Sequence, residues 1–419
     1  MSRLPTNSLA HALLEAARID TAVLAGQSLA DGLLGRVDTV ARPAVQDLVY
    51  GSLRAYGRGD FYLARLLQKP LYVDEVRALL LVAIYRIETR PDAVHTVVDQ
   101  AVTAAGEIAG GNFRALVNGV LRNFLRQQPA LTAAFEADEE AAAMHPDWWL
   151  ARLQVAYPND WPGIVAAGNA PPPMGLRVNG RRISRDQYLV LLTGAGIVAT
   201  PVGESGLALE RPVAVDSLPG FGDGLVSVQD PGAQMAAILL DPASGSRVLD
   251  ACAAPGGKTA HLLERSELDL LALDLKPSRC RRIAETLDRL GLKARIEAAD
   301  CAKLTTWWDG RPFDAVLADV PCTASGVVRR NPDAKWLRRE ADIASFAATQ
   351  ARILDALWQV VRPGGKLLYA TCSVFPAENG GQIDRFLERQ PQARRRHEEQ
   401  LLPTAEHDGF FYCLLEKRD

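Results

Sequence analysis

Short apolar segments alternate with helical patterns over residues 231–419, and this alternation restricts the possible folds more than any other feature. The segments 246–251, 268–274 and 313–319 are each followed by a stretch with helical spacing of apolar residues. Units of this kind build an open sheet with parallel strands. We therefore predict an α/β domain over residues 231–419, with its ligands at the carboxyl ends of the strands.

The rest of the chain divides into two further regions. Residues 1–140 are rich in Ala, Leu, Val and Arg, and apolar residues recur at helical spacing, as in Val117, Val120, Leu121 and Phe124. This pattern predicts an all-helical domain. Residues 145–230 mix short alternating runs with Pro-rich and Trp-containing segments. We predict a small α/β module there.

Composition excludes several classes of protein. Apolar residues make up 48% and charged residues 23% of the chain, so disordered and fibrous proteins are excluded. No apolar run is long enough for a membrane span, and the N-terminus lacks an export signal, so we expect a cytoplasmic protein. The charge balance is 47 − 50 = −3, and a site for a polyanion must therefore be local.

A turn rich in small residues, 250–259, follows one predicted strand and opens a helix. A phosphate-binding P-loop would need glycine where Cys252 stands, and the Gly-x-Gly-x-x-Gly of dinucleotide sites is missing. A purely structural tight turn remains open. Small residues here allow the backbone to approach a ligand closely.

Four consecutive strands end in an acid, and this series favours a cofactor site. Asp274 lies about 20 residues past the glycines, where a carboxylate can accept hydrogen bonds from ribose hydroxyls. Asp300 would receive an adenine amino group. A single aspartate is more often a helix cap, but four around one loop favour an adenosyl cofactor without phosphates. The four acids are Asp250, Asp274, Asp300 and Asp319.

Two cysteines follow strands in polar surroundings, Cys322 within 319–326 and Cys372 within 370–373. Both settings are typical of an exposed, ionised thiol, whereas Cys280, Cys301 and Cys413 fit small buried hydrophobes. Because there is no Cys-x-x-Cys pair and the six histidines are scattered, we expect no metal, and a redox pair is a weaker alternative.

Two thiols and an acid at strand ends suit methyl transfer to carbon 5 of cytosine. That carbon becomes nucleophilic only after a thiolate adds to carbon 6. An acid at the ring nitrogen promotes the addition, and a base must later remove the carbon-5 proton. Asp319, Cys322 and Cys372 would supply these groups.

The chain resembles the bacterial ribosomal RNA cytosine-5 methyltransferases of the RsmB (Sun/Fmu) type. The resemblance is carried by residues 250–259, 274–279, 319–326, 329–336 and 369–379. It implies a Rossmann-like class I methyltransferase domain that uses S-adenosylmethionine. It also implies an N-terminal domain similar to the RNA-binding NusB fold, most clearly in residues 112–122. A domain that merely stabilises the enzyme is the alternative for this region.

The resemblance also implies roles for single residues. Cys372 would attack carbon 6, and Cys322 would assist release, while Asp319 and Lys258 would complete the catalytic set. A structural ion pair is an equal alternative for Lys258. The implied cofactor contacts are Cys252, Ala253, Ala254, Pro255, Gly256, Gly257, Lys258, Asp274, Asp300 and Asp319.

The expected partner is 16S rRNA, before the small subunit is fully assembled, and the chain is expected to be a monomer. Two arginine clusters would bind phosphates, although solvated arginines remain an alternative for each member. A transfer RNA cytosine-5 methyltransferase and a noncatalytic RNA-binding assembly factor are the competing functions. The predicted RNA contacts are Arg177, Arg181, Arg182, Arg185, Arg329 and Arg330.

Overall fold

The structure is a computed structural model that describes residues 4–418, and the chain forms two compact units. The first unit contains the described residues up to Ala170 together with the segment Val328–Arg338. The second unit contains Pro171–Val327 and the described residues from Arg339 onward. Within residues 4–418, no helix is both long and apolar enough to cross a bilayer.

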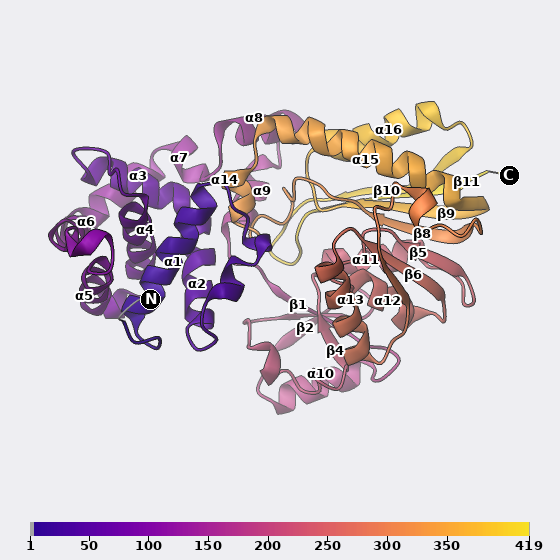
Figure 1. Cartoon of the computed structure of the whole chain (residues 1–419), viewed down its shortest axis with the longest axis horizontal. Helices are drawn as coiled ribbons and strands as arrows, with labels where there is room; N and C mark the ends of the chain where they lie inside the picture. Colours follow the sequence, from indigo (N-terminus) through magenta and orange to yellow (C-terminus); the bar gives the residue numbers. More distant parts are fainter. Residues whose placement is uncertain (1–3, 419) are drawn as a thin grey trace. The chain divides into compact units, whose positions relative to one another are not determined.

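The first unit is helical, which confirms the prediction from apolar spacing (Figure 1). Its central helix carries the run from Ala78 to Ile84, which is buried throughout because helices surround it on several sides. The helices are α1 (Leu9–Leu24), α2 (Arg42–Arg54), α3 (Tyr56–Leu66), α4 (Asp74–Thr89), α5 (Val94–Ala105), α6 (Arg114–Glu136), α7 (Glu139–Ala143), α8 (Asp147–Ala156), α9 (Trp161–Asn169) and α14 (Asp333–Leu337).

Helix α14 belongs to this unit although it follows the predicted catalytic loop in sequence. The carboxylate of Asp333 accepts hydrogen bonds from the Ser28 hydroxyl at 2.9 Å and the Leu29 amide at 3.0 Å. The Trp336 ring lies edge to face on Tyr56, with 4.7 Å between ring centroids. The segment after residue 327 is therefore anchored among the N-terminal helices.

The first unit also includes α8 and α9 and extends to Ala170, so the predicted division at residue 145 falls within this unit, just before α8. Trp149, Leu150 and Leu153 form the buried side of α8.

The small module predicted from the mixed pattern is present in the second unit. Its antiparallel sheet has the order β2-β3-β1-β4. Ser184 and Gln187 form a capping box that starts α10 (Arg185–Gly194), and this helix packs Tyr188 and Leu192 into the sheet's core. The strands are β1 (Met174–Val178), β2 (Ala199–Val202), β3 (Gly206–Leu209) and β4 (Val226–Val228).

The predicted α/β domain is a seven-stranded sheet with the order β10-β11-β9-β8-β5-β6-β7. Neighbouring strands from β7 to β9 pair in parallel, and β11 is antiparallel to both β9 and β10. The strands are β5 (Arg247–Asp250), β6 (Asp269–Asp274), β7 (Arg295–Ala298), β8 (Phe313–Asp319), β9 (Val361–Thr371), β10 (Ala393–Leu401) and β11 (Phe410–Lys417). β9 begins at Val361, which pairs with Phe313.

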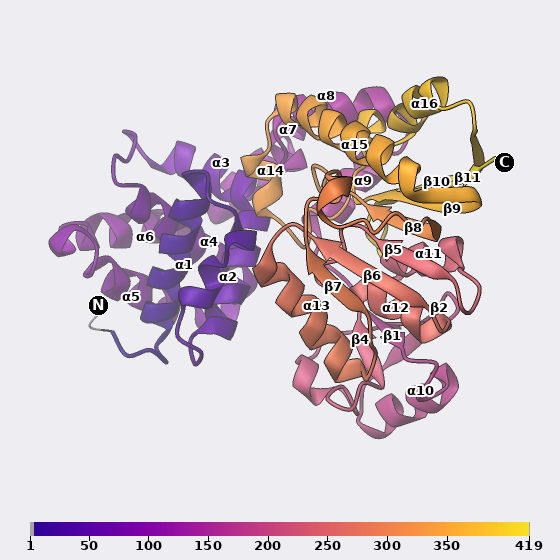
Figure 2. The same ribbon diagram turned by 45° about the vertical axis from the view of Figure 1, so that its right-hand side comes forward.

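Helices cover both faces of this sheet (Figures 1 and 2). One face packs against α11 (Pro231–Leu240), α12 (Gly257–Arg265) and α13 (Pro277–Leu290), and the other against α15 (Glu340–Val360) and α16 (Gly380–Arg389). Val248 and Leu249 show the alternation, because each contributes to a different core. The loops that follow the parallel strands therefore meet at one edge, between the two layers.

Candidate active site

A cavity of about 350 Å³ opens at the carboxyl ends of the parallel strands. Its wall comes from the loops after β5 to β9 and from one side of α15. Seven residues predicted from sequence as site residues line it together: Cys252, Ala254, Asp274, Asp300, Asp319, Cys322 and Cys372. The sheet thus brings together side chains as far apart in sequence as Cys252 and Cys372, which are separated by 120 positions.

The turn between β5 and α12 has the tight backbone expected from its small residues. Gly256 has a φ of +98°, and a Cβ there would come within 3.2 Å of the Ile283 Cα, so only glycine fits. The cavity wall includes Cys252 and Ala254 from this turn. The other residues predicted there as cofactor contacts, Ala253, Pro255, Gly256, Gly257 and Lys258, do not line the cavity but shape the turn and the start of α12.

Asp274 is held rigidly on the cavity wall. Its side chain is 3% exposed, and one carboxylate oxygen accepts from the Ala254 amide at 3.3 Å while the other accepts from the Lys276 amide at 3.2 Å. Asp300 accepts from the Ala302 amide at 3.0 Å and lies 3.3 Å from the Arg352 guanidinium. Each acid keeps unused acceptor capacity, which suits the hydroxyl and amino donors of an adenosyl group.

Asp250, the first acid of the series, lies beneath the site instead of lining it. It is fully buried and accepts a hydrogen bond from the Thr259 hydroxyl at 2.6 Å. Burial raises the pKa of Asp250 to about 7, against the effect of the Thr259 bond. Of the four strand-end acids, three reach the cavity and one supports the start of α12.

Lys258 and Asp319 form an ion pair, with 2.6 Å between the ammonium nitrogen and a carboxylate oxygen. Burial opposes the charged form of Lys258, but the charge and hydrogen bond of Asp319 outweigh it and raise the pKa of the lysine. Lys258 thus reaches the cavity through Asp319, which stands on the wall. The lysine brings a fixed positive charge close to the carboxylate of Asp319 on the wall.

The two predicted reactive thiols are in contact, with 3.3 Å between the sulfurs of Cys322 and Cys372. Cys372 is partly exposed, whereas Cys322 is buried, so only one of them has the exposure expected from sequence. The hydrogen bond shared with Cys372, together with burial, raises the pKa of the Cys322 thiol. Cys322 therefore keeps its proton at neutral pH in this state.

Several wall residues were missed by sequence reasoning. Thr349, Arg352 and Ile353 project from one side of α15 at spacings of three and four residues, a signal present in the predicted long helix but not tied to the site. Cys301 is buried as expected, yet it also lines the cavity, with its sulfur 4.0 Å from that of Cys252.

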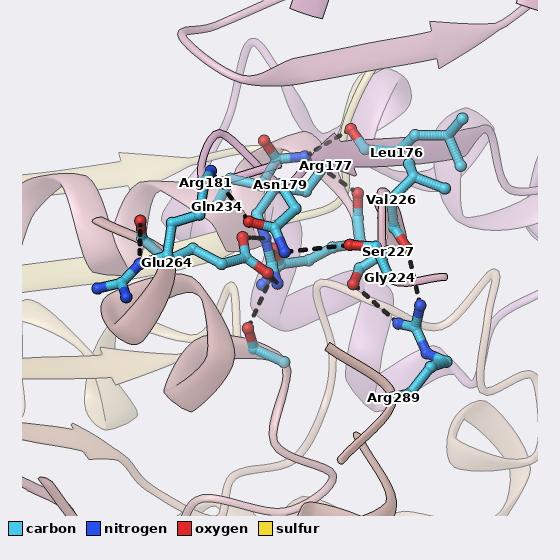
Figure 3. Close-up of polar contacts among 12 residues, drawn as sticks. Leu176, Arg177, Asn179, Arg181, Gly224, Val226, Ser227, Gln234, Glu264 and Arg289 are labelled. Carbon is cyan, nitrogen blue, oxygen red and sulfur yellow. Dashed lines mark hydrogen bonds and ion pairs between the residues drawn. The ribbon is translucent and has the colours of Figure 1, made fainter. Parts of the chain in front are cut away.

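Arg177 does not face solvent, contrary to its predicted place in an RNA-binding cluster (Figure 3). Its guanidinium makes two 2.8 Å bonds to the carboxylate of Glu264 and a third of 2.8 Å to the Gly257 carbonyl. It also donates to the Gln229 side chain. The physical reason is that β1 is buried on both faces, so an arginine on it is enclosed by α12.

The other arginines of this cluster lie nearer the surface. Arg181 and Arg182 are exposed, and they donate to the carbonyls of Glu264 at 3.1 Å and of Leu290 at 2.9 Å. Arg185 donates to the Gly203 carbonyl at 2.7 Å. These three stay candidates for phosphate contact, although Arg181 is paired with the carboxylate of Glu267 and Arg185 lies 3.9 Å from that of Asp186.

The second arginine cluster belongs to the first unit. Arg329 is 2% exposed, and its carbonyl accepts a hydrogen bond from Arg54 at 3.0 Å. Arg330 is half-buried. Phosphate contact is therefore retained as a prediction for Arg330 but does not suit Arg329 in this state. Across residues 4–418, no group of three or more His, Cys, Asp or Glu is arranged to hold a metal.

Comparison with known proteins agrees with this architecture. Three family models match: the 16S rRNA methyltransferase RsmB/F over residues 237–416, the RsmF/B-like ferredoxin-like domain over 145–216, and the NusB family over 12–126. The ribosomal RNA small subunit methyltransferase B of Vibrio cholerae is 44% identical over 386 residues, which cover 89% of both chains. The chain belongs to the RsmB family.

Other relatives support the same placement of this RsmB-family chain. The ribosomal RNA small subunit methyltransferase B of Pseudomonas putida is 44% identical, over 96% of this chain and 98% of that one. The crystal structure of PH0851 has a TM-score of 0.82 at 24% identity, with full coverage of both chains, and shows the same fold.

The cofactor of this RsmB-family chain is S-adenosylmethionine. The cavity fits it in two respects. The wall offers carboxylate acceptors at Asp274 and Asp300 for the polar atoms of the nucleoside. The small side chains of Ala251 and Ala254 leave room beside them, and the acidic wall suits a sulfonium cation.

Proposed function

We propose that this chain transfers a methyl group from S-adenosylmethionine to carbon 5 of a cytosine in 16S rRNA, through a transient bond between Cys372 and carbon 6. The observation that carries the proposal is the pair of thiols, 3.3 Å apart, on the wall of the cavity that also holds Asp274 and Asp319. Transfer to an unactivated pyrimidine carbon needs such a nucleophile, since that carbon alone is too weak.

The residues divide the work as follows. The Cys372 thiolate adds to carbon 6, and the ring electrons move toward the nitrogen that Asp319 and Lys258 would hydrogen-bond. S-adenosylmethionine supplies an electrophilic methyl group. Carbon 5 would take the methyl group, and S-adenosylhomocysteine would leave. Cys322, after losing its own thiol proton to water, would then remove the carbon-5 proton, directly or through a water molecule, so that the carbon–sulfur bond breaks and the Cys372 thiolate returns.

In this proposal, residues outside the cavity bind the RNA. Arg181, Arg182, Arg185 and Arg330 would contact phosphates, and the helical first unit would orient the substrate. One cytosine would be extruded into the cavity, as enzymes acting on single bases require. In this proposal the chain acts in the cytoplasm, as a monomer, on 16S rRNA that is not yet fully assembled.

Methyl transfer from labelled S-adenosylmethionine tests the proposal. The purified chain is incubated with protein-free 16S rRNA or with transfer RNA, and methylated cytosines are mapped by bisulfite sequencing. We expect label at one or a few cytosines of the 16S rRNA. Label confined to transfer RNA would support the alternative substrate, and RNA binding without any transfer would leave only the role of an assembly factor.

Replacing Asp274 with alanine should weaken cofactor binding by about 1–3 kcal/mol, the usual cost of losing a buried hydrogen-bond partner. The measurement is isothermal titration calorimetry with S-adenosylmethionine. Asp288→Ala is the matched control, because this exposed residue of α13 lies outside the cavity wall. An unchanged dissociation constant for Asp274→Ala would remove Asp274 from the cofactor site.

A further inference from the structure

A buried carboxylate lies behind the two thiols and has no part in the chemistry described above. Glu378 is fully buried, in the short helical turn that follows Cys372 in sequence. One of its oxygens accepts from the Thr323 hydroxyl and from the Ser373 hydroxyl, both at 2.6 Å. The other accepts from the Thr323 amide at 2.9 Å and from the Gln350 side chain at 3.1 Å.

These partners have a specific relation to the reaction. Thr323 directly follows Cys322, and Ser373 directly follows Cys372. One carboxylate therefore bonds to the residue next to each thiol, although the two turns lie 50 residues apart in sequence. The Ser325 and Ser373 hydroxyls, 2.9 Å apart, tie the same two turns together a second time.

The network directs its hydrogen bonds toward Glu378. The Ser373 oxygen accepts from the Phe375 amide at 3.0 Å, so its hydroxyl proton is free to point to the carboxylate. The Ser325 oxygen accepts from the Val374 amide at 2.9 Å, so its hydroxyl proton is free to point to the Ser373 oxygen. A chain of this kind is strengthened by mutual polarisation in a buried site. Four donors to one buried carboxylate fix its position far more tightly than an exposed acid.

We propose that Glu378 is a positioning residue that holds the turns of Cys322 and Cys372 in one register and so keeps the two sulfurs in contact. The proposal rests on the function proposed above and adds what aligns its two thiols. A fixed distance between the two sulfurs suits this chemistry. The Cys372 sulfur must reach carbon 6 of the base while the Cys322 sulfur lies near the adjacent carbon 5.

The carboxylate also acts on Cys322 through its charge. The negative charge of Glu378 adds to the effects of Cys372 and of burial that raise the pKa of Cys322. Removing that charge should move the titration of Cys322 to lower pH. This readout is independent of methyl transfer, and loss of a merely structural contact would not produce it.

Glu378→Gln tests the proposal, because the amide keeps the shape but replaces one acceptor oxygen with a donor that faces hydroxyl donors. We expect kcat to fall by roughly 10²-fold, the cost of misplacing reacting groups by about 1 Å, with KM for S-adenosylmethionine unchanged within about threefold. Glu388→Gln is the control, on the exposed side of α16. Wild-type kcat in Glu378→Gln would overturn the proposal.

Oxidation by diamide measures the sulfur contact without any methyl transfer, so it separates this proposal from the proposed function. Diamide takes two electrons and two protons from a thiol pair and leaves a disulfide. We expect Glu378→Gln to form the Cys322–Cys372 disulfide at least about tenfold more slowly, as peptide mass spectrometry would report, since the 3.3 Å contact is lost. The Cys252–Cys301 pair, at 4.0 Å and outside this network, should react at the wild-type rate.

A second variant keeps the test decisive if Glu378→Gln does not fold. Ser373→Ala removes one donor to Glu378 and leaves the other three. Ser373→Ala should lower kcat and slow formation of the Cys322–Cys372 disulfide relative to wild type, but by less than Glu378→Gln does. Disulfide formation at wild-type rate in Ser373→Ala, together with wild-type kcat, would refute a positioning role.

Discussion

Cys372→Ala abolishes methyl transfer to RNA, with an expected loss in kcat of at least about 10³-fold, as for other nucleophiles that act as part of a unit. The physical reason is that carbon 6 then receives no nucleophile and carbon 5 stays unreactive, because Cys252, the other partly exposed thiol on the wall, lies in the turn predicted to hold the cofactor. Binding of S-adenosylmethionine should remain, because the acids on the wall are untouched. Single-turnover transfer of labelled methyl, with calorimetry alongside, separates the two effects.

Cys322→Ala has a different expected result, so the two variants together distinguish the nucleophile from the residue that assists release. Addition and methyl transfer proceed, but the carbon-5 proton stays, so the RNA remains bonded to Cys372 and migrates with the protein in a denaturing gel. Cys280→Ala, a half-exposed thiol of α13 outside the cavity wall, should turn over normally and form no adduct. Product formation without an adduct in Cys322→Ala would count against these roles, as would an adduct that survives Cys372→Ala.

The residues on the cavity wall could be predicted because strand periodicity carries topological information. Asp274, Asp300, Asp319 and Cys372 each follow an apolar segment, and the ends of parallel strands must meet at one edge. The sequence therefore identified which residues converge without giving any distance. The contact between the sulfurs of Cys322 and Cys372 depends on the register of β8 against β9, which only the folded sheet determines.

The roles of some other residues could not be predicted from the sequence, because burial rather than residue type decides them. Glu378 lies in a motif quoted from the sequence, but nothing there distinguishes a buried carboxylate from an exposed one. Asp250 ends a strand as the other acids do, yet its side chain turns under α12 to Thr259. Helical spacing predicts that the wall residues of α15 share one side of the helix. Whether that side faces the cavity depends on how the helix packs against the sheet.

Arg177 shows the same limit most clearly. In sequence it stands among exposed arginines, and an RNA contact was the natural prediction. All five residues of β1 are buried, so the usual alternation of inward and outward side chains is absent from this strand. Its guanidinium instead joins the small module to α12 at both ends of that helix, at Gly257 and at Glu264 (Figure 3).

Arg177→Met should lower the free energy of unfolding by about 3–5 kcal/mol, because it leaves the Glu264 carboxylate buried without its partner. The side chains of both residues are at most 4% exposed, so water cannot replace the lost bonds without opening the structure. Urea-induced unfolding measures the change. Arg211→Met, at an exposed arginine of the same module, should stay within about 0.5 kcal/mol of wild type.

A double variant and a salt series separate this role from RNA binding. Arg177→Met with Glu264→Met removes both charges, so much of the lost stability should return, as when a buried ion pair is replaced by apolar side chains of similar volume. If Arg177 instead neutralised a phosphate, its loss would leave stability unchanged and would reduce the slope of log affinity against log salt by roughly 0.7–0.9. An unchanged unfolding free energy with a reduced slope would restore the predicted RNA contact of Arg177 and exclude a stabilising role for its ion pair with Glu264.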